Sequence, residues 1–430
     1  MEITKKFILD TLGVALAGSN AVGCKEVLNL ITDWQGKEES TVIMYGNKVP
    51  SPNAALINSM MAHALDFDDA HDTATLHANV TVLPAVLALA EREGGVSGQA
   101  LIAAVATGND IACRLGLSLT GPLTWLKTST MGYFGATLAC GKILGLDEEK
   151  MLHAIGIAYS QCAGNPQCLV DGGLVKRMQP AFAAKAGVLS ALLAQQGITG
   201  ATNIFEGKHG FFPLYHPGKD YDRKKITEGL GRFFEGTNLS VKLYPCCRAT
   251  NGCIDATLGL VTENNIPPEE ISAVIAHVTQ TAYGMVGKPF EIREVPQVDA
   301  QFSIPYTMAI AITGKRVSID DFFESKIRSD AQRLELARKV EVIADQEPVP
   351  RHRCVIEIKM KNGRSYSNHV EILKGDPRNP VSFEDVAAKF RESSAFAAKS
   401  LSSDRAEEII NLIKSLETVS NIDTMVKMLV

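Results

Sequence analysis

The sequence has no excess of positive charge. Its 430 residues include 43 Lys and Arg against 48 Asp and Glu, which gives a formal net charge of -5 and an isoelectric point near 6. A chain with this balance has no general field that would gather nucleic acid or an anionic membrane, so we expect neither as a partner. An anionic ligand must then be recognised by a local basic pocket, which favours a small molecule.

Paired cysteines and nucleotide-binding motifs are also missing. The nine cysteines form no CxxC pair, and an odd number does not suit the disulfide framework of a secreted protein. The glycines form neither a strand-GxGxxG-helix unit nor a GxxxxGK[ST] loop, so we expect no nucleotide cofactor. Asp10 interrupts the apolar N-terminal run, which makes it unsuitable as a signal peptide or membrane span. The sequence therefore predicts a soluble, cytoplasmic protein.

Helical periodicity dominates the first half of the chain. From residue 1 to about 235, apolar residues recur at helical spacing in segments rich in alanine and leucine. One such segment opens with Ser51 as the expected N-cap and Pro52 at the first helical position. The density of small residues indicates helices that approach closely and are buried on more than one face.

Strand-like alternation replaces this pattern after about residue 265. Cys354, Ile356, Ile358 and Met360 alternate with polar residues, and Asn362-Gly363 predicts a type I′ hairpin turn. From about residue 375 the pattern is helical again. The sequence thus predicts a mainly α fold, with a large all-helical domain built from both chain ends (1–238 and 378–430) and a smaller α+β domain (239–377).

The segment HALDFDDAHDTATLH, residues 63–77, concentrates acidic residues and histidines. Its Asp68, Asp69 and Asp72 spell DDxxD, the pattern by which helical terpenoid synthases hold magnesium, but no second acidic motif accompanies it. A transition metal could be bound by His63, Asp66, His71 and His77, although their spacing matches no tight ligand pair. The third interpretation is general acid and base chemistry between two helices. Caps and solvated loop groups are the plain alternative, above all for Asp72 and Thr73.

Several collinear blocks make the chain similar to one family. The run MMAHALDFDDAH followed by LPAVLALAE resembles the signature of the MmgE/PrpD family, which includes 2-methylcitrate dehydratase, cis-aconitate decarboxylase and iminodisuccinate epimerase. Further resemblance lies in KRMQPAFAAKAGVLSALLAQQGITG (176–200), VKLYPCC (241–247) and FSIPYTMAIAI (302–312). The resemblance implies a homodimer of metal-free, cofactor-free enzymes, each subunit with a helical domain, an α+β lid and a substrate cleft between them. It also implies a small di- or tricarboxylate substrate that loses a proton next to a carboxylate.

Removing such a proton builds negative charge on an anion, so the site needs a base and fixed cationic donors. The resemblance implies five catalytic residues: Asp66, His77, Lys176, Lys242 and Tyr306. We expect the lysines to bind the anion and His77 with Asp66 to transfer protons. Substrate-binding candidates are His71, a rival to His77; Lys127 and Arg177, which flank family positions; and Cys247, where relatives often have histidine. Read without the family, Lys176 and Arg177 are typical of a solvated helix start, Lys242 of an ordinary strand and Tyr306 of a helical core.

The departures from the family pattern bear on the reaction. Leu126 stands where the decarboxylase and dehydratase branches carry a histidine, and Ala70 stands where the decarboxylase branch has threonine. The missing histidine weakens both lyase assignments and leaves room for epimerisation, and Ala70 argues against cis-aconitate as the substrate. We still predict a dehydratase-type lyase similar to 2-methylcitrate dehydratase, because the resemblance implies that this is the commoner activity of the family. The alternatives are an epimerase of the iminodisuccinate type, a decarboxylase of the cis-aconitate type and, more distantly, a magnesium-dependent terpenoid synthase.

Overall fold

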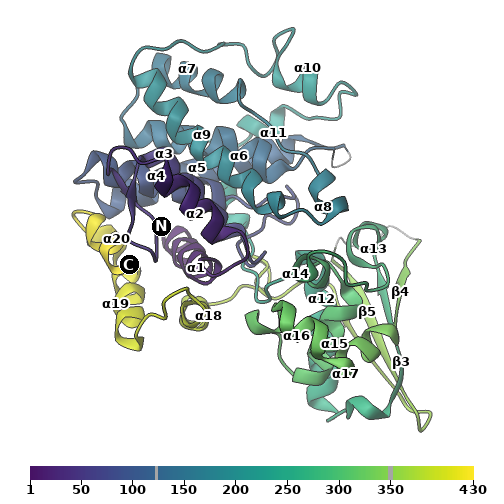
Figure 1. The fold of residues 1–430 in the computed structure, drawn as a ribbon. Helices are drawn as coiled ribbons and strands as arrows, with labels where there is room; N and C mark the ends of the chain where they lie inside the picture. The colour runs from purple at the N-terminus through teal and green to yellow at the C-terminus, as the bar shows by residue number, and fades with distance from the viewer. Residues whose placement is uncertain (122–123, 347–351) are drawn as a thin grey trace. The chain divides into compact units, whose positions relative to one another are not determined.

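The chain is divided into two compact units in the computed structural model, which describes residues 1–121, 124–346 and 352–430. Unit 1 comprises residues 1–241 and 382–430, and unit 2 comprises residues 242–381. Helices dominate the fold, and a four-stranded mixed sheet lies in unit 2 (Figure 1). Unit 1 is not purely helical, contrary to the prediction: Ser40–Thr41 (β1) and Lys48–Val49 (β2) pair as a short antiparallel ribbon.

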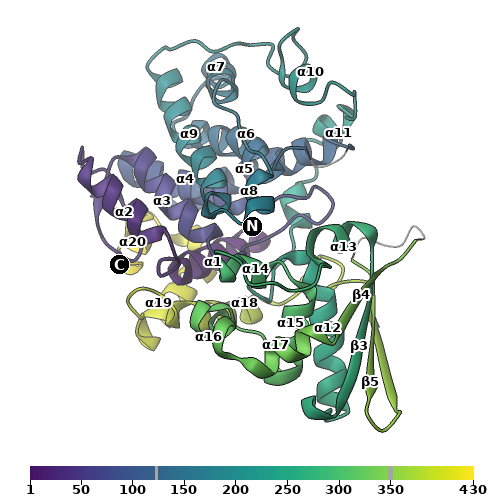
Figure 2. The same cartoon turned by 45° about the vertical axis from the view of Figure 1, so that its right-hand side comes forward.

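The helices of unit 1 come from both ends of the chain. Its N-terminal part contains α1 (Glu2–Gly18), α2 (Cys24–Asp33), α3 (Ser51–His63), α4 (Asn79–Glu93), α5 (Gly98–Ser118), α6 (Lys127–Ile143), α7 (Glu148–Tyr159), α8 (Gln167–Asp171), η1 (Leu174–Arg177), α9 (Met178–Gln195), α10 (Phe211–Tyr215), α11 (Lys224–Thr227) and η2 (Glu235–Asn238). Its C-terminal part contains α18 (Phe383–Ala395), α19 (Ser403–Lys414), η5 (Leu416–Thr418) and α20 (Asp423–Met428). Figure 2 shows yellow α18 close to purple α1, and these two helices are in extensive contact.

The centre of unit 1 is a bundle in which α3, α4, α5, α6 and α9 pack against one another. Nearly every residue of α3 and α4 is buried, as the all-round apolar pattern predicts. By length and composition α5 could span a membrane, with a mean hydropathy of 1.3, but 67% of that window is buried inside the protein. Its apolar surface thus serves the packing of this bundle.

One predicted helix start is wrong by a residue. The N-cap of α3 is Pro50, and Ser51 is already helical, with its N–H donating to Oε2 of Glu39 at 3.1 Å. The Glu39 carboxylate thus satisfies the N–H of Ser51 itself, which is one of the orphan donors at the helix start.

A close approach between α1 and α3 yields a stability prediction. A Cβ on Gly18 would lie 1.9 Å from the carbonyl oxygen of Met61, so Gly18→Ala must push two helix backbones apart. We expect a loss of about 1–3 kcal/mol, measured by urea unfolding. The control is Gly284→Ala in α13 (Gln280–Val286), where no heavy atom lies within 4 Å of the new methyl group; it should stabilise by about 0.5–1 kcal/mol. Equal effects of the two variants would contradict the packing argument.

Unit 2 is an α+β body with strand order β4-β3-β5-β6. β3 (Ile271–Val278) pairs in parallel with β4 (Val340–Ala344) and antiparallel with β5 (Cys354–Met360), which pairs antiparallel with β6 (Ser365–Val370). Its helices are α12 (Arg248–Glu263), η3 (Pro268–Glu270), α13, α14 (Pro296–Gln301), α15 (Ile304–Gly314), η4 (Ile319–Phe322), α16 (Glu324–Ser329) and α17 (Ala331–Arg338).

The predicted hairpin exists, but its turn differs from the prediction. The alternate residues of β5 from Cys354 to Met360 are buried, which confirms the expected apolar face. At the turn, Gly363 has a φ of +86°, whereas Asn362 does not have positive φ. The N–H of Met360 donates to the carbonyl of Arg364, so the loop has three residues with glycine in the left-handed position. A type I′ turn would need two such residues.

Candidate active site

The acidic loop, residues 64–78, connects α3 to α4 in unit 1. Its backbone is pinned by reciprocal hydrogen bonds between Ala70 and Ser240, at 3.0 and 2.7 Å, and by the N–H of His71, which donates to the carbonyl of Leu76. Asp66 adopts a left-handed φ of +51°. That conformation is unusual for a residue other than glycine and is held only where the surroundings fix it. The backbone of the loop is thus held in one conformation, and most of its side chains are buried.

Asp66 and Lys176 form the first pair of the site. Nζ of Lys176, in η1, donates to Oδ1 of Asp66 at 2.7 Å. The Asp66 side chain is 5% exposed and that of Lys176 is 17% exposed, so the carboxylate is inside the protein while the ammonium retains some access to solvent. An ammonium has three N–H donors, so Asp66 does not use all of them.

His63 and His77 form the second part of the site, with Asp68 between their rings. Nδ1 of His63 lies 3.0 Å from Oδ2 of Asp68, and Nδ1 of His77 lies 2.9 Å from the same oxygen. The ring centroids are 5.0 Å apart in an edge-to-face arrangement. The Lys176 ammonium is near enough to act electrostatically on His63. These five residues of unit 1 therefore form one cluster, which we call the proton-handling cluster: His63, Asp66, Asp68, His77 and Lys176.

The hydrogen bonds define which nitrogen of His77 is available for chemistry. Nδ1 lies 2.6 Å from the backbone carbonyl oxygen of Asp69, which can only accept, so Nδ1 carries a proton. In the neutral ring Nε2 is then the basic nitrogen. The side chain is 20% exposed. His77 therefore has the tautomer that a general base requires, and the Asp68 carboxylate complements the positive charge of the protonated ring.

The buried groups around His77 have strongly shifted pKa values. Burial, reinforced by the Lys176 ammonium, lowers the pKa of His63 to about 4, so this imidazole is neutral and donates to Asp68. Burial opposes the ionisation of Asp68, but the two imidazoles outweigh it and hold the pKa of Asp68 well below its usual value. Burial and the neighbouring Asp68 raise the pKa of Asp69 to about 7. Asp69 accepts from the N–H groups of Ala78 and Asn79, at the start of α4.

The His63 shift predicts a pH-dependent stability. The folded-state pKa of about 4 lies below the ordinary value of 6.5, so between these values His63 binds more protons in the unfolded chain. The contribution of His63 to the free energy of unfolding therefore falls as the pH drops from 6.5 to 4. Relative to the wild type, His63→Gln should therefore gain stability as the pH is lowered through this window. Urea unfolding at pH 4.5 and 7 measures the difference. A gap between the two proteins that does not change with pH would contradict a neutral, buried His63.

Three predicted substrate-binding residues of unit 1 are engaged with the protein. Nδ1 of His71 accepts from the N–H of Ala74 at 3.1 Å, and Nε2 lies 3.5 Å from Glu235. Nζ of Lys127 donates to the carbonyls of Gly116 and Leu119 near the end of α5, both at 3.0 Å. Nη1 of Arg177 donates to the carbonyl of Val22 at 2.9 Å. Each of these contacts joins two parts of the protein itself. A role in substrate binding stays a prediction for His71, Lys127 and Arg177.

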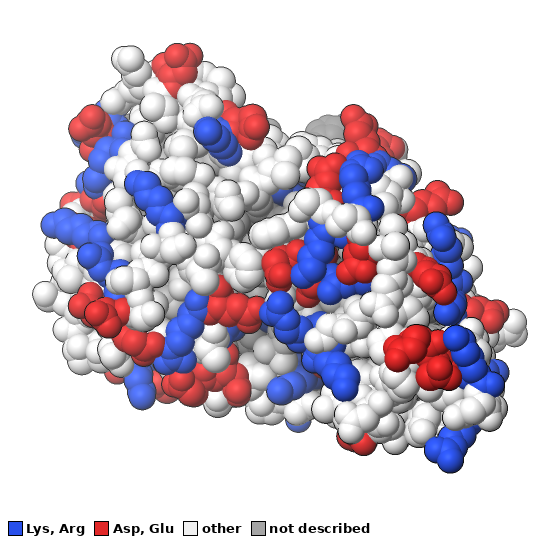
Figure 3. Space-filling model, turned by 60° about the horizontal axis from the view of Figure 1, so that its bottom comes forward, with Lys and Arg blue, Asp and Glu red and all other residues white. Residues whose placement is uncertain are grey.

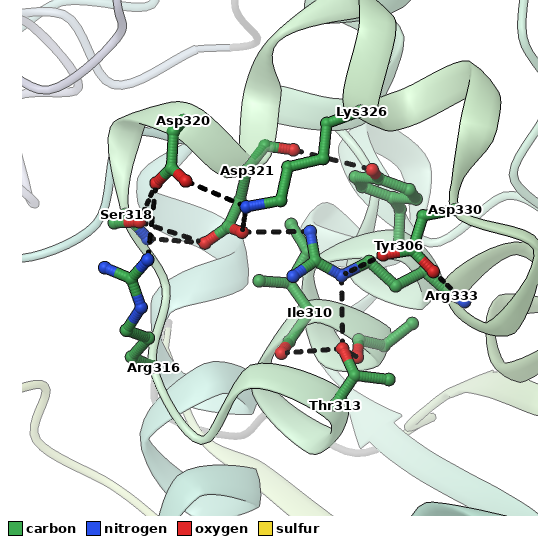
Figure 4. A network of polar contacts seen from close by, with 11 residues as sticks. Tyr306, Ile310, Thr313, Arg316, Ser318, Asp320, Asp321, Lys326, Asp330 and Arg333 are labelled. Atoms are coloured by element: carbon green, nitrogen blue, oxygen red, sulfur yellow. Dashed lines mark hydrogen bonds and ion pairs between the residues drawn. The ribbon is translucent and has the colours of Figure 1, made fainter.

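The remaining predicted residues, Lys242, Cys247 and Tyr306, belong to unit 2. Lys242 is fully buried at the start of the unit, and Cys247 is the N-cap of α12 within the apolar core. Figure 4 shows Tyr306 of α15 within a network of polar contacts that includes Asp321 and Arg333. Tyr306 is fully buried, stacks on Phe290 and has its pKa raised by burial to about 12. Its hydroxyl lies 3.5 Å from the carbonyl oxygen of Asp321. Tyr306 thus has the surroundings of a core residue. The catalytic roles of Lys242 and Tyr306 and the substrate-binding role of Cys247 stay predictions.

The acidic loop does not arrange its carboxylates as a shared magnesium site. Asp68 faces the imidazoles, Asp69 accepts from the start of α4, and Asp72 accepts from the hydroxyl of Ser240 at 2.6 Å. Ligand atoms of His63, Asp68 and His77 lie within 4.8 Å of one another. In this arrangement Nδ1 of His77 donates to the Asp69 carbonyl, so it would have to give up that proton to become a ligand.

A helical body with an α+β unit and a buried histidine–carboxylate–lysine cluster has the features of an enzyme that moves protons on an anionic substrate. Residues 1–224 match the model of the MmgE/PrpD N-terminal domain, and residues 244–418 match that of the MmgE/PrpD C-terminal domain. The chain belongs to the MmgE/PrpD family. This membership confirms the resemblance and excludes the terpenoid synthase alternative.

The chain is similar along its whole length to named relatives. It is 27% identical to the cis-aconitate decarboxylase-like protein oryM of Aspergillus oryzae, covering 100% of this chain and 92% of the relative. It is 28% identical to the cis-aconitate decarboxylases of Aspergillus terreus and Homo sapiens, covering 100% of this chain and 91% and 90% of the relatives.

Sequence reasoning assigned no catalytic role to two members of the cluster. His63 was considered only as a metal ligand, and Asp68 only as a magnesium ligand or structural residue. Their contact spans five positions, across the end of α3 and the left-handed turn at Asp66. A histidine at a helix end, followed by a carboxylate after a tight turn, is the signal that could have linked them.

Proposed function

We propose that this protein is a lyase that decarboxylates a small polycarboxylate of the cis-aconitate class, with His77 as the residue that transfers the proton to carbon. The observation that carries the proposal is the geometry of His77, whose Nδ1 is held by Asp68 and by the Asp69 carbonyl. The names of the full-length relatives support decarboxylation over the predicted dehydration.

The cluster supplies what the reaction needs. As the carboxyl group leaves as carbon dioxide, its bonding electrons pass to the remaining carbon, and a proton must be delivered there. The imidazolium of His77 can donate that proton from Nε2 while Asp68 stabilises the ring. The Lys176 ammonium, held by Asp66, provides a fixed positive charge for a substrate carboxylate. We expect no metal or organic cofactor to take part.

A second candidate, epimerisation, is favoured by one observation, whereas dehydration is supported only by the family resemblance. Leu126 is the N-cap of α6, two residues before Thr128, whose hydroxyl accepts from the N–H of His77 at 3.1 Å. Leu126 is thus an apolar residue close in sequence to Thr128, which contacts the cluster. The family resemblance implies a histidine at position 126 in the decarboxylase and dehydratase branches. Epimerisation needs only a base for each face of one carbon, so it is the reaction least affected by this replacement.

The test is incubation with citrate-like, aconitate-like and aspartate-like acids in deuterated water, followed by NMR. The proposal expects release of carbon dioxide and one deuterium on the carbon that carried it. Inversion without a new alkene would establish the second candidate instead, and loss of water would establish dehydration. An absence of any exchange, elimination or decarboxylation across the panel would refute all three reactions. We also propose a homodimer in the cytoplasm, and sedimentation of the purified protein tests the dimer.

A further inference from the structure

The ammonium of Lys389 is buried inside unit 1, where it contacts Phe67 and Asp10. Lys389 lies on α18, in the C-terminal segment of the chain, and its side chain is 5% exposed. Nζ donates to the backbone carbonyl of Phe67 at 2.7 Å, lies 2.7 Å from Oδ1 of Asp10 on α1, and is 3.8 Å from the centroid of the Phe67 ring. Both the backbone carbonyl and the ring of Phe67, the residue between Asp66 and Asp68, thus contact Lys389.

The position of Phe67 explains why these contacts matter. The carbonyl that Lys389 holds belongs to the peptide that joins Phe67 to Asp68, so its orientation sets the direction from which the Asp68 side chain leaves the backbone. On the other side of Phe67, Asp66 keeps its left-handed φ of +51°. A residue in this conformation persists only when the surrounding structure fixes it. Lys389 supplies such a constraint directly beside both carboxylates.

Packing of α1 against α18 does not require a charged pair. Two buried ions are costly to desolvate, and apolar residues of similar size often replace such a pair with equal or greater stability. The contact that an apolar residue could not make is the hydrogen bond to the Phe67 carbonyl. The hydrogen bond to the acidic loop therefore requires an ammonium at position 389. The packing of α1 against α18 does not require one.

We propose that Lys389 is a positioning residue for the reaction: by holding the Phe67 carbonyl it fixes Asp68, and through Asp68 it orients the His77 ring. This inference rests on the proposed role of His77. The link is short, because Asp68 follows the held carbonyl directly and its Oδ2 lies 2.9 Å from Nδ1 of His77. The C-terminal helices of the chain therefore complete the proton-handling cluster without contributing a group that touches the substrate.

The test separates positioning from simple packing with two variants. The double variant Lys389→Met with Asp10→Leu replaces the buried pair by apolar side chains, which should preserve the fold but lose the carbonyl contact. Asp10→Asn keeps the lysine and its carbonyl contact but weakens the pair. The control is Lys5→Met, because Lys5 is also a buried lysine of unit 1, joining α1 to Lys414 and Glu417 near the C-terminus without contacting the acidic loop.

The primary measurement is the NMR titration of the His77 ring, assigned with His77→Gln, because it needs no substrate. We expect a displaced His77 midpoint in the double variant, and the wild-type midpoint in Asp10→Asn and Lys5→Met. With a substrate, kcat should fall by about 10²-fold in the double variant with a smaller change in KM.

A stable double variant with the wild-type His77 titration would overturn the inference. A displaced His77 midpoint in Asp10→Asn would also overturn the inference, because the displacement would then come from the ion pair and not from the carbonyl contact. This variant tests the positioning role of Lys389 even if the double variant does not fold. If no acid is turned over while the titration shifts as expected, the proposed reaction fails and the positioning role stands.

Discussion

Replacing His77 by glutamine is expected to lower kcat by about 10²–10⁴-fold, the usual contribution of a positioned acid or base. The glutamine amide can still donate to the Asp69 carbonyl, which accepts from Nδ1 of His77 at 2.6 Å. Since His77 is partly exposed, the free energy of unfolding should change little. The measurement is a steady-state assay on the acid identified by the NMR panel, together with a urea unfolding curve that verifies the fold.

The matched control is His209→Gln, because His209 is an exposed histidine of the same unit and lies outside the proton-handling cluster. Its backbone carbonyl, which the substitution keeps, accepts from the hydroxyl of Tyr159. It should retain the wild-type kcat. If His77→Gln kept more than half of the wild-type kcat, His77 would not be the proton donor. His71 could hardly replace it, because Nδ1 of His71 accepts from the N–H of Ala74 and Nε2 faces Glu235.

Much of the fold follows from local patterns in the sequence. All-round apolar periodicity is enough to predict buried helices such as α3 and α4, and strict alternation predicts the buried face of β5. The errors concern the exact residue at which a helix begins and the exact type of a turn. Ser51 is not the N-cap of α3 because it is already the first helical residue, after Pro50, and the β5–β6 loop is not type I′ because Gly363 takes a positive φ whereas Asn362 does not.

The candidate site was predictable to a smaller extent. Asp66, His77 and Lys176 follow from the family resemblance, and the structure brings these three into one cluster. The place of Asp68 between two imidazoles could not be predicted, because it depends on a left-handed turn at a residue other than glycine. That turn lies beside a backbone carbonyl held by a lysine 322 positions further along the chain. Local propensity carries no information about such a contact.

Replacing Arg114 by methionine is expected to cost about 3–5 kcal/mol of unfolding free energy, because it leaves a buried carboxylate without its cation. Arg114 is 1% exposed. Nε lies 2.9 and 3.0 Å from the oxygens of Asp110, Nη1 donates to the carbonyl of Glu228 at 2.6 Å, and Nη2 donates to that of Phe233 at 2.6 Å. One guanidinium therefore joins α5 to the loop that leads to Glu235, and this loop should become sensitive to limited proteolysis in the variant.

The comparison is with Arg391→Met, since Arg391 also binds two carboxylates, those of Glu384 and Glu407, but at the surface of unit 1. Exposed pairs contribute about 0–1 kcal/mol, so urea unfolding should separate the two variants clearly. Similar small losses would show that the Arg114 network is not needed for stability. A loss of protease resistance confined to residues 226–238, with the His77 titration unchanged, would show that the loop is held independently of the proton-handling cluster. A change in both would mean that the hydrogen bond from His71 to Glu235 links the two.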